Sequence, residues 1–273
     1  MNQPVMTIAG SDPSGGAGIQ ADLKTFTTLG VYGAAVITAL TAQNTQGVFG
    51  SIVVDPAFIA LQIQRVLEDI PIRFIKTGML ANAEVITTVA DNLPQDTFLV
   101  CDPVMYAKSG YPLLEKEAIT TLKEELISRA RVLTPNYPEL AELLGDVFIP
   151  ENAEESGKRL FQAYPNLQAL VVKGGHRSPV GNQVEDILLW REGTTIHTKK
   201  VYHPYIKTQN THGTGCTLAS AITAYLARHE NLENALVKAI DYVAFLIQKT
   251  QQETYGKGHG PLPHHRFSEK EAL

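Results

Sequence analysis

Short apolar runs alternate with segments of helical periodicity along most of the chain, and this alternation limits the possible folds more than any other feature. Residues 5–9 form an apolar run of strand length, and residues 18–29 then carry apolar side chains at helical spacing. The same order repeats toward the carboxyl end. It is typical of βαβ units, which give a largely parallel sheet with helices on both faces. We therefore predict an α/β fold.

The pattern assigns most of the chain to elements. The expected strands are 5–9, 35–40, 74–77, 98–102, 132–134 and 169–173, and the expected helices are 18–29, 58–67, 83–93, 116–128, 139–144, 153–163, 216–228 and 232–252. Residues 187–190 and 195–201 should form a β-hairpin with Glu192-Gly193 at its turn. The tail from Tyr255 is rich in Gly, His and Pro. We expect its last residues to be disordered and the pair His264-His265 to be solvated rather than metal-bound.

Composition and charge disfavour several classes of protein. Of the 273 residues, 44% are hydrophobic and 19% charged, which is ordinary for a globular protein, and we expect one domain over residues 1–273. A net charge of -5 disfavours nucleic-acid binding, and no apolar run approaches the length of a membrane span. Having only two cysteines and no basic-then-apolar leader favours a reducing cytoplasm.

Ligands of open parallel sheets bind beyond the carboxyl ends of the strands, and polar or glycine-rich segments follow the predicted strands here. The first is a glycine-rich loop. A Walker A loop needs Lys and then Ser or Thr where Gly16-Ala17 stands, so that interpretation fails. A dinucleotide fingerprint fits the glycines, but no acid occurs between Asp22 and Asp55 to hold a ribose. A substrate-binding loop remains, in which Asp22 either accepts from a ligand or only complements the helix dipole.

A second glycine-rich turn, Gly213-Thr214-Gly215, precedes a long apolar helix. Successive backbone N–H groups at the positive end of a helix bind anions, and phosphoryl transfer needs such donors. His212 and Cys216 flank the turn, and a thiol at a helix start tends to have a lowered pKa. We expect an anion hole here, with Cys216 as a candidate base. The alternative is that Gly215 and Cys216 are small only for packing.

Charged and amide side chains end several predicted strands. Asp102 and Glu139 lie just beyond two of them, where carboxylates can hold Mg²⁺ beside phosphates, although Glu139 could instead only complement a helix dipole. Lys173 ends an apolar strand and runs into glycines, which suits a phosphate contact. Gln43 could match an aminopyrimidine edge and Met79 could wall a flat ring. On pattern alone, packing in the core is the better explanation of both Gln43 and Met79.

Together these segments resemble the hydroxymethylpyrimidine/phosphomethylpyrimidine kinases of the ribokinase superfamily. The resemblance covers roughly residues 5–267, and its long, ordered motifs are highly specific. The motifs are 9–25 (AGSDPSGGAGIQADLKT), 42–45 (AQNT), 76–80 (KTGML), 102–105 (DPVM), 108–110 (KSG), 134–136 (TPN), 173–176 (KGGH), 211–217 (THGTGCT) and 256–258 (GKG).

The resemblance implies a ribokinase-like three-layer αβα sandwich with a mostly parallel central sheet, and a homodimer. It implies that ATP and Mg²⁺ are used to phosphorylate 4-amino-5-hydroxymethyl-2-methylpyrimidine, and then its monophosphate to the diphosphate, in thiamine biosynthesis. The residue roles follow by carry-over. Gln43 reads the pyrimidine; Gly10, Met79 and Val104 border the ring, with Asp22 close by; Lys173, Thr211, His212, Gly213, Thr214 and Gly215 contact ATP phosphates; Gly213 to Cys216 form the anion hole; and Asp102 and Glu139 lie on the metal side.

Two other interpretations remain open. Most of the superfamily carries Asp where this chain has Cys216, and some pyridoxal kinases share the cysteine. A pyridoxal/pyridoxine kinase is therefore an alternative. A non-catalytic vitamin-binding protein on the same scaffold is another, but the presence of Lys173, the glycine turn and both metal-side acids counts against it.

Overall fold

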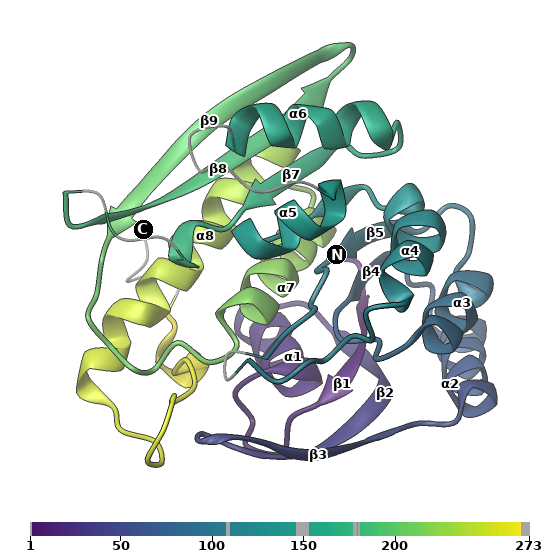
Figure 1. The fold of residues 1–273 in the computed structure, drawn as a ribbon, viewed down its shortest axis with the longest axis horizontal. Helices are drawn as coiled ribbons and strands as arrows, with labels where there is room; N and C mark the ends of the chain where they lie inside the picture. The colour runs from purple at the N-terminus through teal and green to yellow at the C-terminus, as the bar shows by residue number, and fades with distance from the viewer. Residues whose placement is uncertain (1, 108–109, 146–152, 177–178, 180, 269–273) are drawn as a thin grey trace.

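The computed structural model describes residues 2–107, 110–145, 153–176, 179 and 181–268, and places a nine-stranded sheet at their centre (Figure 1). In spatial order the strands are β3 (Gly47–Val53), β2 (Gly33–Asn44), β1 (Val5–Ser11), β4 (Phe74–Thr77), β5 (Phe98–Cys101), β6 (Val132–Leu133), β7 (Ala169–Val172), β8 (Gln183–Glu192) and β9 (Thr195–Pro204). The six strands from β2 to β7 run parallel, and β3, β8 and β9 pair antiparallel at the edges. The predicted mostly parallel sheet is confirmed.

Helices cover both faces of the sheet and complete the predicted αβα sandwich. One apolar core lies under α2 (Pro56–Asp69), α3 (Ala83–Asn92), α4 (Ala118–Thr121), α5 (Tyr137–Leu144) and α6 (Ala153–Ala163). The other lies under α1 (Gly18–Thr28), α7 (Thr214–Ala227) and α8 (Leu232–Lys249). Strands buried on both faces explain why the apolar runs in the sequence are continuous rather than alternating.

Side-chain caps fix the starts of most long helices. Asp55 accepts hydrogen bonds from the first turn of α2, and Asn82, Asn136 and Asn231 do the same for α3, α5 and α8. The first turns of α1 and α7 differ, because neither N-cap residue, Ala17 or Gly213, provides a side-chain cap.

The predicted C-terminal hairpin is confirmed with longer strands. Glu192 pairs with Thr195, so the turn consists of Gly193-Thr194, one residue later than expected. Gly193 has a φ of 60°, the left-handed conformation that two-residue hairpin turns favour.

Two elements differ from expectation. β3 was not predicted, because its two glycines interrupt the pattern of a strand; it is held as an edge strand by its pairing with β2. The expected helix 116–128 is instead α4 followed by a π-turn, Leu122–Leu126, and a 3-10 turn, Ile127–Arg129. The wider π-turn lets the adjacent residues Leu126 and Ile127 both be fully buried.

The tail is more ordered than expected. His264 is only 2% exposed, its Nε2 lies 3.0 Å from Thr217 Oγ1 on α7, and burial lowers its pKa to about 4. The expectation that His264 is solvated is therefore wrong, although its neighbour His265 is exposed. A segment that folds back onto α7 buries a histidine that composition alone assigned to solvent. The residues expected to be disordered include 269–273, which lie outside the described residues.

Candidate active site

The carboxyl ends of the parallel strands meet the start of α7, and the predicted site residues lie along this edge. β1 leads into the loop 12–17, β5 into Asp102 and β7 into Lys173. The first residues of α7 contact both this loop and Lys173. Segments that are up to about 200 residues apart in the sequence therefore form one site.

Gly213 gives α7 an open N-terminus. Its φ is 81°, and a Cβ atom there would overlap the carbonyl oxygen of Gly16, so only glycine fits. In the described part of the chain no side chain caps this turn, which leaves the first N–H groups, at Thr214, Gly215 and Cys216, free to bind an anion. Thr211 and His212 lead directly into the turn, and their contact with ATP phosphates remains a prediction.

Lys173 lies between the two acids that were predicted to hold a metal. Its Nζ is 2.8 Å from Asp102 Oδ1 and 3.6 Å from Glu139 Oε2. Burial alone would lower the pKa of Lys173, but the charges of Asp102 and Glu139 outweigh it and hold that pKa above its ordinary value. The ammonium group is therefore a permanent positive charge at the end of β7.

The start of α7 is adjacent to this charged cluster. A Cβ atom on Gly215 would lie 3.3 Å from Lys173 Nζ and 3.6 Å from Asp102 Oδ2. Asp102 Oδ1 accepts from Thr134 and Lys173, whereas Oδ2 is buried and has no hydrogen-bond partner among the described residues. Free N–H groups, a fixed cation and a carboxylate oxygen without a hydrogen-bond partner among the described residues therefore converge at one point.

Glu139 has two functions in the local structure. With Asn136 it forms the capping box that begins α5, and its Oε2 accepts from the Asn136 N–H at 2.7 Å. Burial raises the pKa of Glu139 to about 7 against the opposing charge of Lys173, and Asp102 adds to the rise. Glu139 can therefore both begin α5 and contribute its carboxyl group to the charged cluster around Lys173.

Cys216 lies in the first turn of α7 and is partly exposed. Burial raises the pKa of its thiol to about 11 although Lys76 opposes the rise, and Asp22 and Asp102 add to it. The expected lowering of this pKa is therefore wrong, because nearby carboxylates and poor solvation outweigh the helix dipole. The thiol is neutral near pH 7.

Three residues expected beside the ring lie on neighbouring strand ends. A Cβ atom on Gly10 would lie 2.9 Å from Met79 Sδ, so the thioether rests directly on the β1 backbone. The Met79 carbonyl accepts from Thr38 Oγ1 at 2.7 Å, which fixes this segment after β4. Val104 follows β5 and is half-buried. Their contact with a ring remains a prediction.

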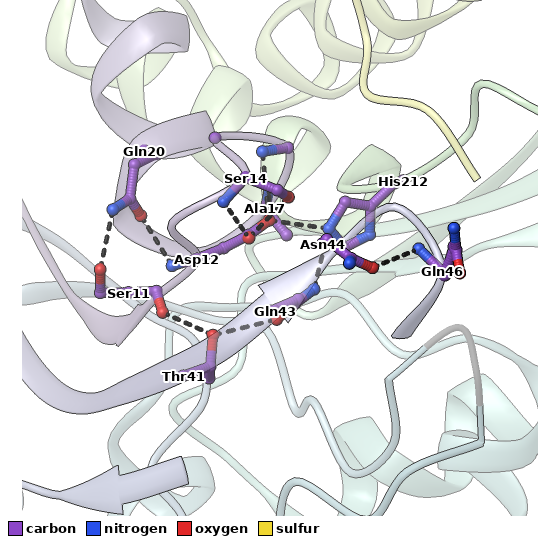
Figure 2. Close-up of polar contacts among 12 residues, drawn as sticks. Ser11, Asp12, Ser14, Ala17, Gln20, Thr41, Gln43, Asn44, Gln46 and His212 are labelled. Atoms are coloured by element: carbon purple, nitrogen blue, oxygen red, sulfur yellow. Dashed lines mark hydrogen bonds and ion pairs between the residues drawn. The ribbon is translucent and has the colours of Figure 1, made fainter. Parts of the chain in front are cut away.

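Gln43, at the end of β2, belongs to a polar network that joins three segments (Figure 2). One end of its amide lies 3.0 Å from His212 Nε2, and His212 Nε2 lies 2.7 Å from Asp12 Oδ2. Asp12 also accepts from the N–H groups of Ser14, Gly16 and Ala17, so it organises the glycine-rich loop. Sequence reasoning did not single out Asp12. Its signal was the Asp-Pro-Ser-Gly run, which is typical of an Asp-capped turn.

Asp22 is fully buried and forms an ion pair that the sequence did not reveal. It accepts from Lys76 Nζ at 2.8 Å, from Thr7 Oγ1 at 2.6 Å and from Ser220 Oγ at 2.6 Å. Both carboxylate oxygens are thus satisfied by protein groups. Its predicted place close to the substrate remains a prediction. A lysine inside the strand run Phe74–Thr77 was the available signal for its partner.

Metal-binding clusters and membrane-spanning helices are both absent from the described residues. No group of three or more His, Cys, Asp or Glu side chains is arranged to hold a metal ion there. No helix in the same part of the chain is long and apolar enough to cross a membrane.

Known proteins resemble this chain over most of its length. Residues 12–263 match the family model described as phosphomethylpyrimidine kinase. The hydroxymethylpyrimidine/phosphomethylpyrimidine kinase of Escherichia coli is 43% identical over 96% of this chain and 96% of its own length. The thiamine biosynthesis bifunctional protein ThiED of Geobacter sulfurreducens is 46% identical over 95% of this chain, which spans 52% of that longer protein.

A solved structure shares the fold. The pyridoxal kinase of Bacillus subtilis, in an ADP complex, superimposes with a TM-score of 0.82 at 30% identity, covering 97% of this chain and 98% of that one. The ribokinase-like fold is therefore confirmed. The family match and the identities above decide between the related kinases: this chain belongs to the hydroxymethylpyrimidine/phosphomethylpyrimidine kinase family.

Proposed function

We propose that this edge of the sheet transfers the γ-phosphoryl group of ATP to the hydroxymethyl oxygen of 4-amino-5-hydroxymethyl-2-methylpyrimidine, and then to the phosphate of the product. The convergence of Gly215, Lys173 and Asp102 carries this proposal. It brings anion-binding N–H groups, a fixed positive charge and a carboxylate oxygen without a hydrogen-bond partner among the described residues to one point. Phosphoryl transfer requires this combination because catalysis consists largely of positioning and charge stabilisation.

In the first transfer the substrate oxygen forms a bond to the γ-phosphorus while the bond from that phosphorus to the ADP oxygen breaks, and the hydroxyl proton passes late in the step to an oxygen of the transferring phosphoryl group. Lys173 and the N–H groups from Gly213 to Cys216 stabilise the negative charge on the transferring oxygens. In the second transfer the nucleophile is a phosphate oxygen, which is already largely deprotonated near pH 7. A base is therefore dispensable for that step, which agrees with the neutral thiol of Cys216.

Asp102 and Glu139 fit a magnesium ion. Mg²⁺ commonly uses one or two carboxylates and completes its coordination with water and substrate phosphates, so a larger protein cluster is not needed. Asp102 Oδ2 is a buried carboxylate oxygen without a hydrogen-bond partner among the described residues, as expected for an oxygen reserved for a cation. When bound, Mg²⁺ would neutralise the phosphate charge.

On the other side of the transfer point, we assign the pyrimidine to the end of β2 and the surface formed by Gly10, Met79 and Val104. The support is local: Met79 and Gly10 are in contact, and Gln43 lies in the network that leads to the α7 turn. An amide matches an aminopyrimidine edge, and a thioether suits a flat ring.

The test is ADP release with purified protein, ATP and each candidate alcohol. We expect two equivalents of ADP per hydroxymethylpyrimidine, with phosphorus NMR showing the monophosphate and then the diphosphate, and no turnover in excess EDTA. Pyridoxal is the second candidate substrate, because the Bacillus subtilis pyridoxal kinase shares this fold. Turnover of pyridoxal but not of the pyrimidine would replace our assignment, and full activity in EDTA would remove the metal from it.

We further propose that residues 1–273 act as one kinase domain, in a reducing cytoplasm, as a homodimer. The two free thiols support the location.

Exposed apolar side chains on the outer strands support the dimer. Leu40 on β2 and Ile52 on β3 face each other and are 49% and 72% exposed, and Phe49 is also on β3. Apolar groups gathered on an edge strand usually mark a protein interface.

A further inference from the structure

The Gln43 amide lies between His212 and Thr41, with one of them at each end (Figure 2). Its Nε2 position is 3.0 Å from His212 Nε2, and its Oε1 position is 3.2 Å from Thr41 Oγ1. An amide nitrogen only donates and an amide oxygen only accepts hydrogen bonds. The donors and acceptors of the two neighbours therefore determine the orientation in which the amide is stable.

At the first end, His212 must donate. Its Nε2 lies 2.7 Å from Asp12 Oδ2. Burial would raise the pKa of Asp12, but hydrogen bonds from His212 and Ser14 lower it to about 2, so this group is a carboxylate that only accepts. The Nε2 atom of His212 must then carry a proton, whether the ring is neutral or charged. An amide nitrogen facing that N–H would oppose donor to donor. The amide oxygen is the stable neighbour.

At the second end, Thr41 must accept. Its hydroxyl has one hydrogen, and Oγ1 lies 3.0 Å from the Ser11 carbonyl oxygen, which can only accept. With that hydrogen committed, Thr41 can only receive a hydrogen bond from Gln43, and the amide nitrogen is required here. A half-turn of the amide about its last side-chain bond satisfies both ends at once. Two independent contacts therefore select the same orientation.

We propose that His212, held by Asp12, and Thr41 are positioning residues that fix the Gln43 amide with its oxygen toward His212, and so make the site specific for a 4-aminopyrimidine bound in one orientation. This inference rests on the proposed role of Gln43 in reading the ring. Asp12 already organises the glycine-rich loop, so the orientation of the amide is built into the same turn that shapes the site.

The orientation of the Gln43 amide matters because the donors and acceptors on the pyrimidine edge must pair with it. A 4-aminopyrimidine presents a donor amine beside an acceptor ring nitrogen, whereas its 4-oxo counterpart presents an acceptor beside a donor. An amide that rotates freely can match either edge. With its oxygen fixed toward His212, Gln43 pairs with the amino form when the amine lies at the His212 end, and with the oxo form only when the ring is reversed and its carbonyl lies at the Thr41 end.

The same orientation aims the reacting group. In the substrate, the hydroxymethyl carbon is attached next to the carbon that bears the amine. Binding the amine at the His212 end therefore turns the hydroxymethyl group toward His212, whose ring lies against Gly16, as does Gly213 at the start of α7. The reverse orientation would turn it toward Thr41 and away from the anion hole. Fixing the amide thus favours productive binding as well as substrate choice.

The test compares kcat/KM for the aminopyrimidine with kcat/KM for 5-hydroxymethyl-2-methylpyrimidin-4-one. We expect His212→Ala to lower this ratio by about tenfold or more, and Thr41→Val, which keeps the other end fixed, by roughly threefold. His197→Ala, a histidine on β9 outside the network, is the matched control and should leave the ratio unchanged. Thermal melts of each variant report folding separately from the ratio.

The outcomes are distinguishable. A structural role alone would lower kcat/KM for both substrates in parallel, and an unchanged ratio in both His212→Ala and Thr41→Val would overturn the inference. Gln43→Leu separates it from the proposed function: if Gln43→Leu removes the discrimination but the two positioning variants do not, Gln43 reads the ring without being fixed. If Gln43→Leu also leaves the ratio unchanged, the assigned role of Gln43 fails.

Discussion

Lys173 is the residue at which the phosphate and metal sides of the site meet. It contacts both Asp102 and Glu139, and the open start of α7 lies against it. A lysine that ends an apolar strand could be recognised from the sequence because packing does not explain it. The position of its partners could not be recognised, because the three strand ends are brought together only by the order of strands in the sheet.

Cys216 is the residue at which the structure changes the chemical expectation most. Burial raises its pKa to about 11, so we expect a neutral thiol that contributes a small side chain to the α7 turn rather than a base. Cys216→Ser should then retain more than about a tenth of the parental kcat, since the N–H groups supply most of the stabilisation. The measurement is kcat against pH from 6 to 9 for both proteins. An alkaline rise in the parent that is missing from Cys216→Ser would identify the thiol as the base.

Glu139 makes stability depend on pH. Its pKa is raised from 4.5 to about 7 in the folded protein, so the folded state binds the proton more tightly than the unfolded state. The protein should be most stable with respect to this group below pH 4.5 and should lose stability as pH rises to 7. We expect Glu139→Gln, which keeps the capping box, to raise the free energy of unfolding at pH 8 by on the order of 2–3 kcal/mol, but not at pH 4.5.

Melting temperatures at pH 4.5, 6 and 8 measure this effect, which should reach several degrees at pH 8. Glu142→Gln is the matched control, because Glu142 is an exposed acid on the same helix. A difference between Glu139→Gln and the parent that is constant across pH would contradict the raised pKa.

At the scale of elements, α/β alternation was enough to predict most strands and helices, because buried parallel strands give continuous apolar runs. β3 was missed because an edge strand with two glycines has no such run. The π-turn that follows α4 was missed because a helical pattern of apolar residues does not reveal such a turn. The Asp12–His212–Gln43 network was beyond sequence reasoning, since it depends on side-chain orientations across three segments.

The turn before α7 is the element on which phosphate binding depends. Gly213→Ala would place a Cβ atom against the Gly16 carbonyl oxygen in addition to imposing a left-handed φ of 81° on alanine. We expect a loss of more than about 3 kcal/mol in the free energy of unfolding, with ADP affinity lost as well. Gly193→Ala is the control: its φ is 60° but no atom lies within 4 Å, so it should lose only about 1 kcal/mol. If urea denaturation shows that Gly213→Ala and Gly193→Ala lose the same free energy of unfolding, the contact with Gly16 has no role in stability.

At the scale of the whole molecule, the exposed apolar pair on β2 and β3 predicts how two chains associate. Ile52→Lys should convert a dimer into a monomer in sedimentation experiments, because a buried lysine at an apolar interface is strongly unfavourable. Tyr32→Lys is the control, since Tyr32 is also exposed but lies just before the opposite end of β2. A parent protein that sediments as a monomer at all concentrations would refute the dimer, and a dimer that survives Ile52→Lys would place the interface elsewhere.

The most direct test of phosphoryl transfer at this edge is a single-turnover measurement of product formation by parent and Lys173→Ala proteins with MgATP and hydroxymethylpyrimidine. Lys173→Ala should slow both phosphorylations by at least about tenfold, because one phosphate-directed charge in a poorly solvated site is worth more than roughly 1.4 kcal/mol, while pyrimidine binding by calorimetry stays unchanged. Lys199→Ala, an exposed lysine on β9, should match the parent. Parental rates in Lys173→Ala would contradict the placement of phosphoryl transfer between Lys173 and the start of α7.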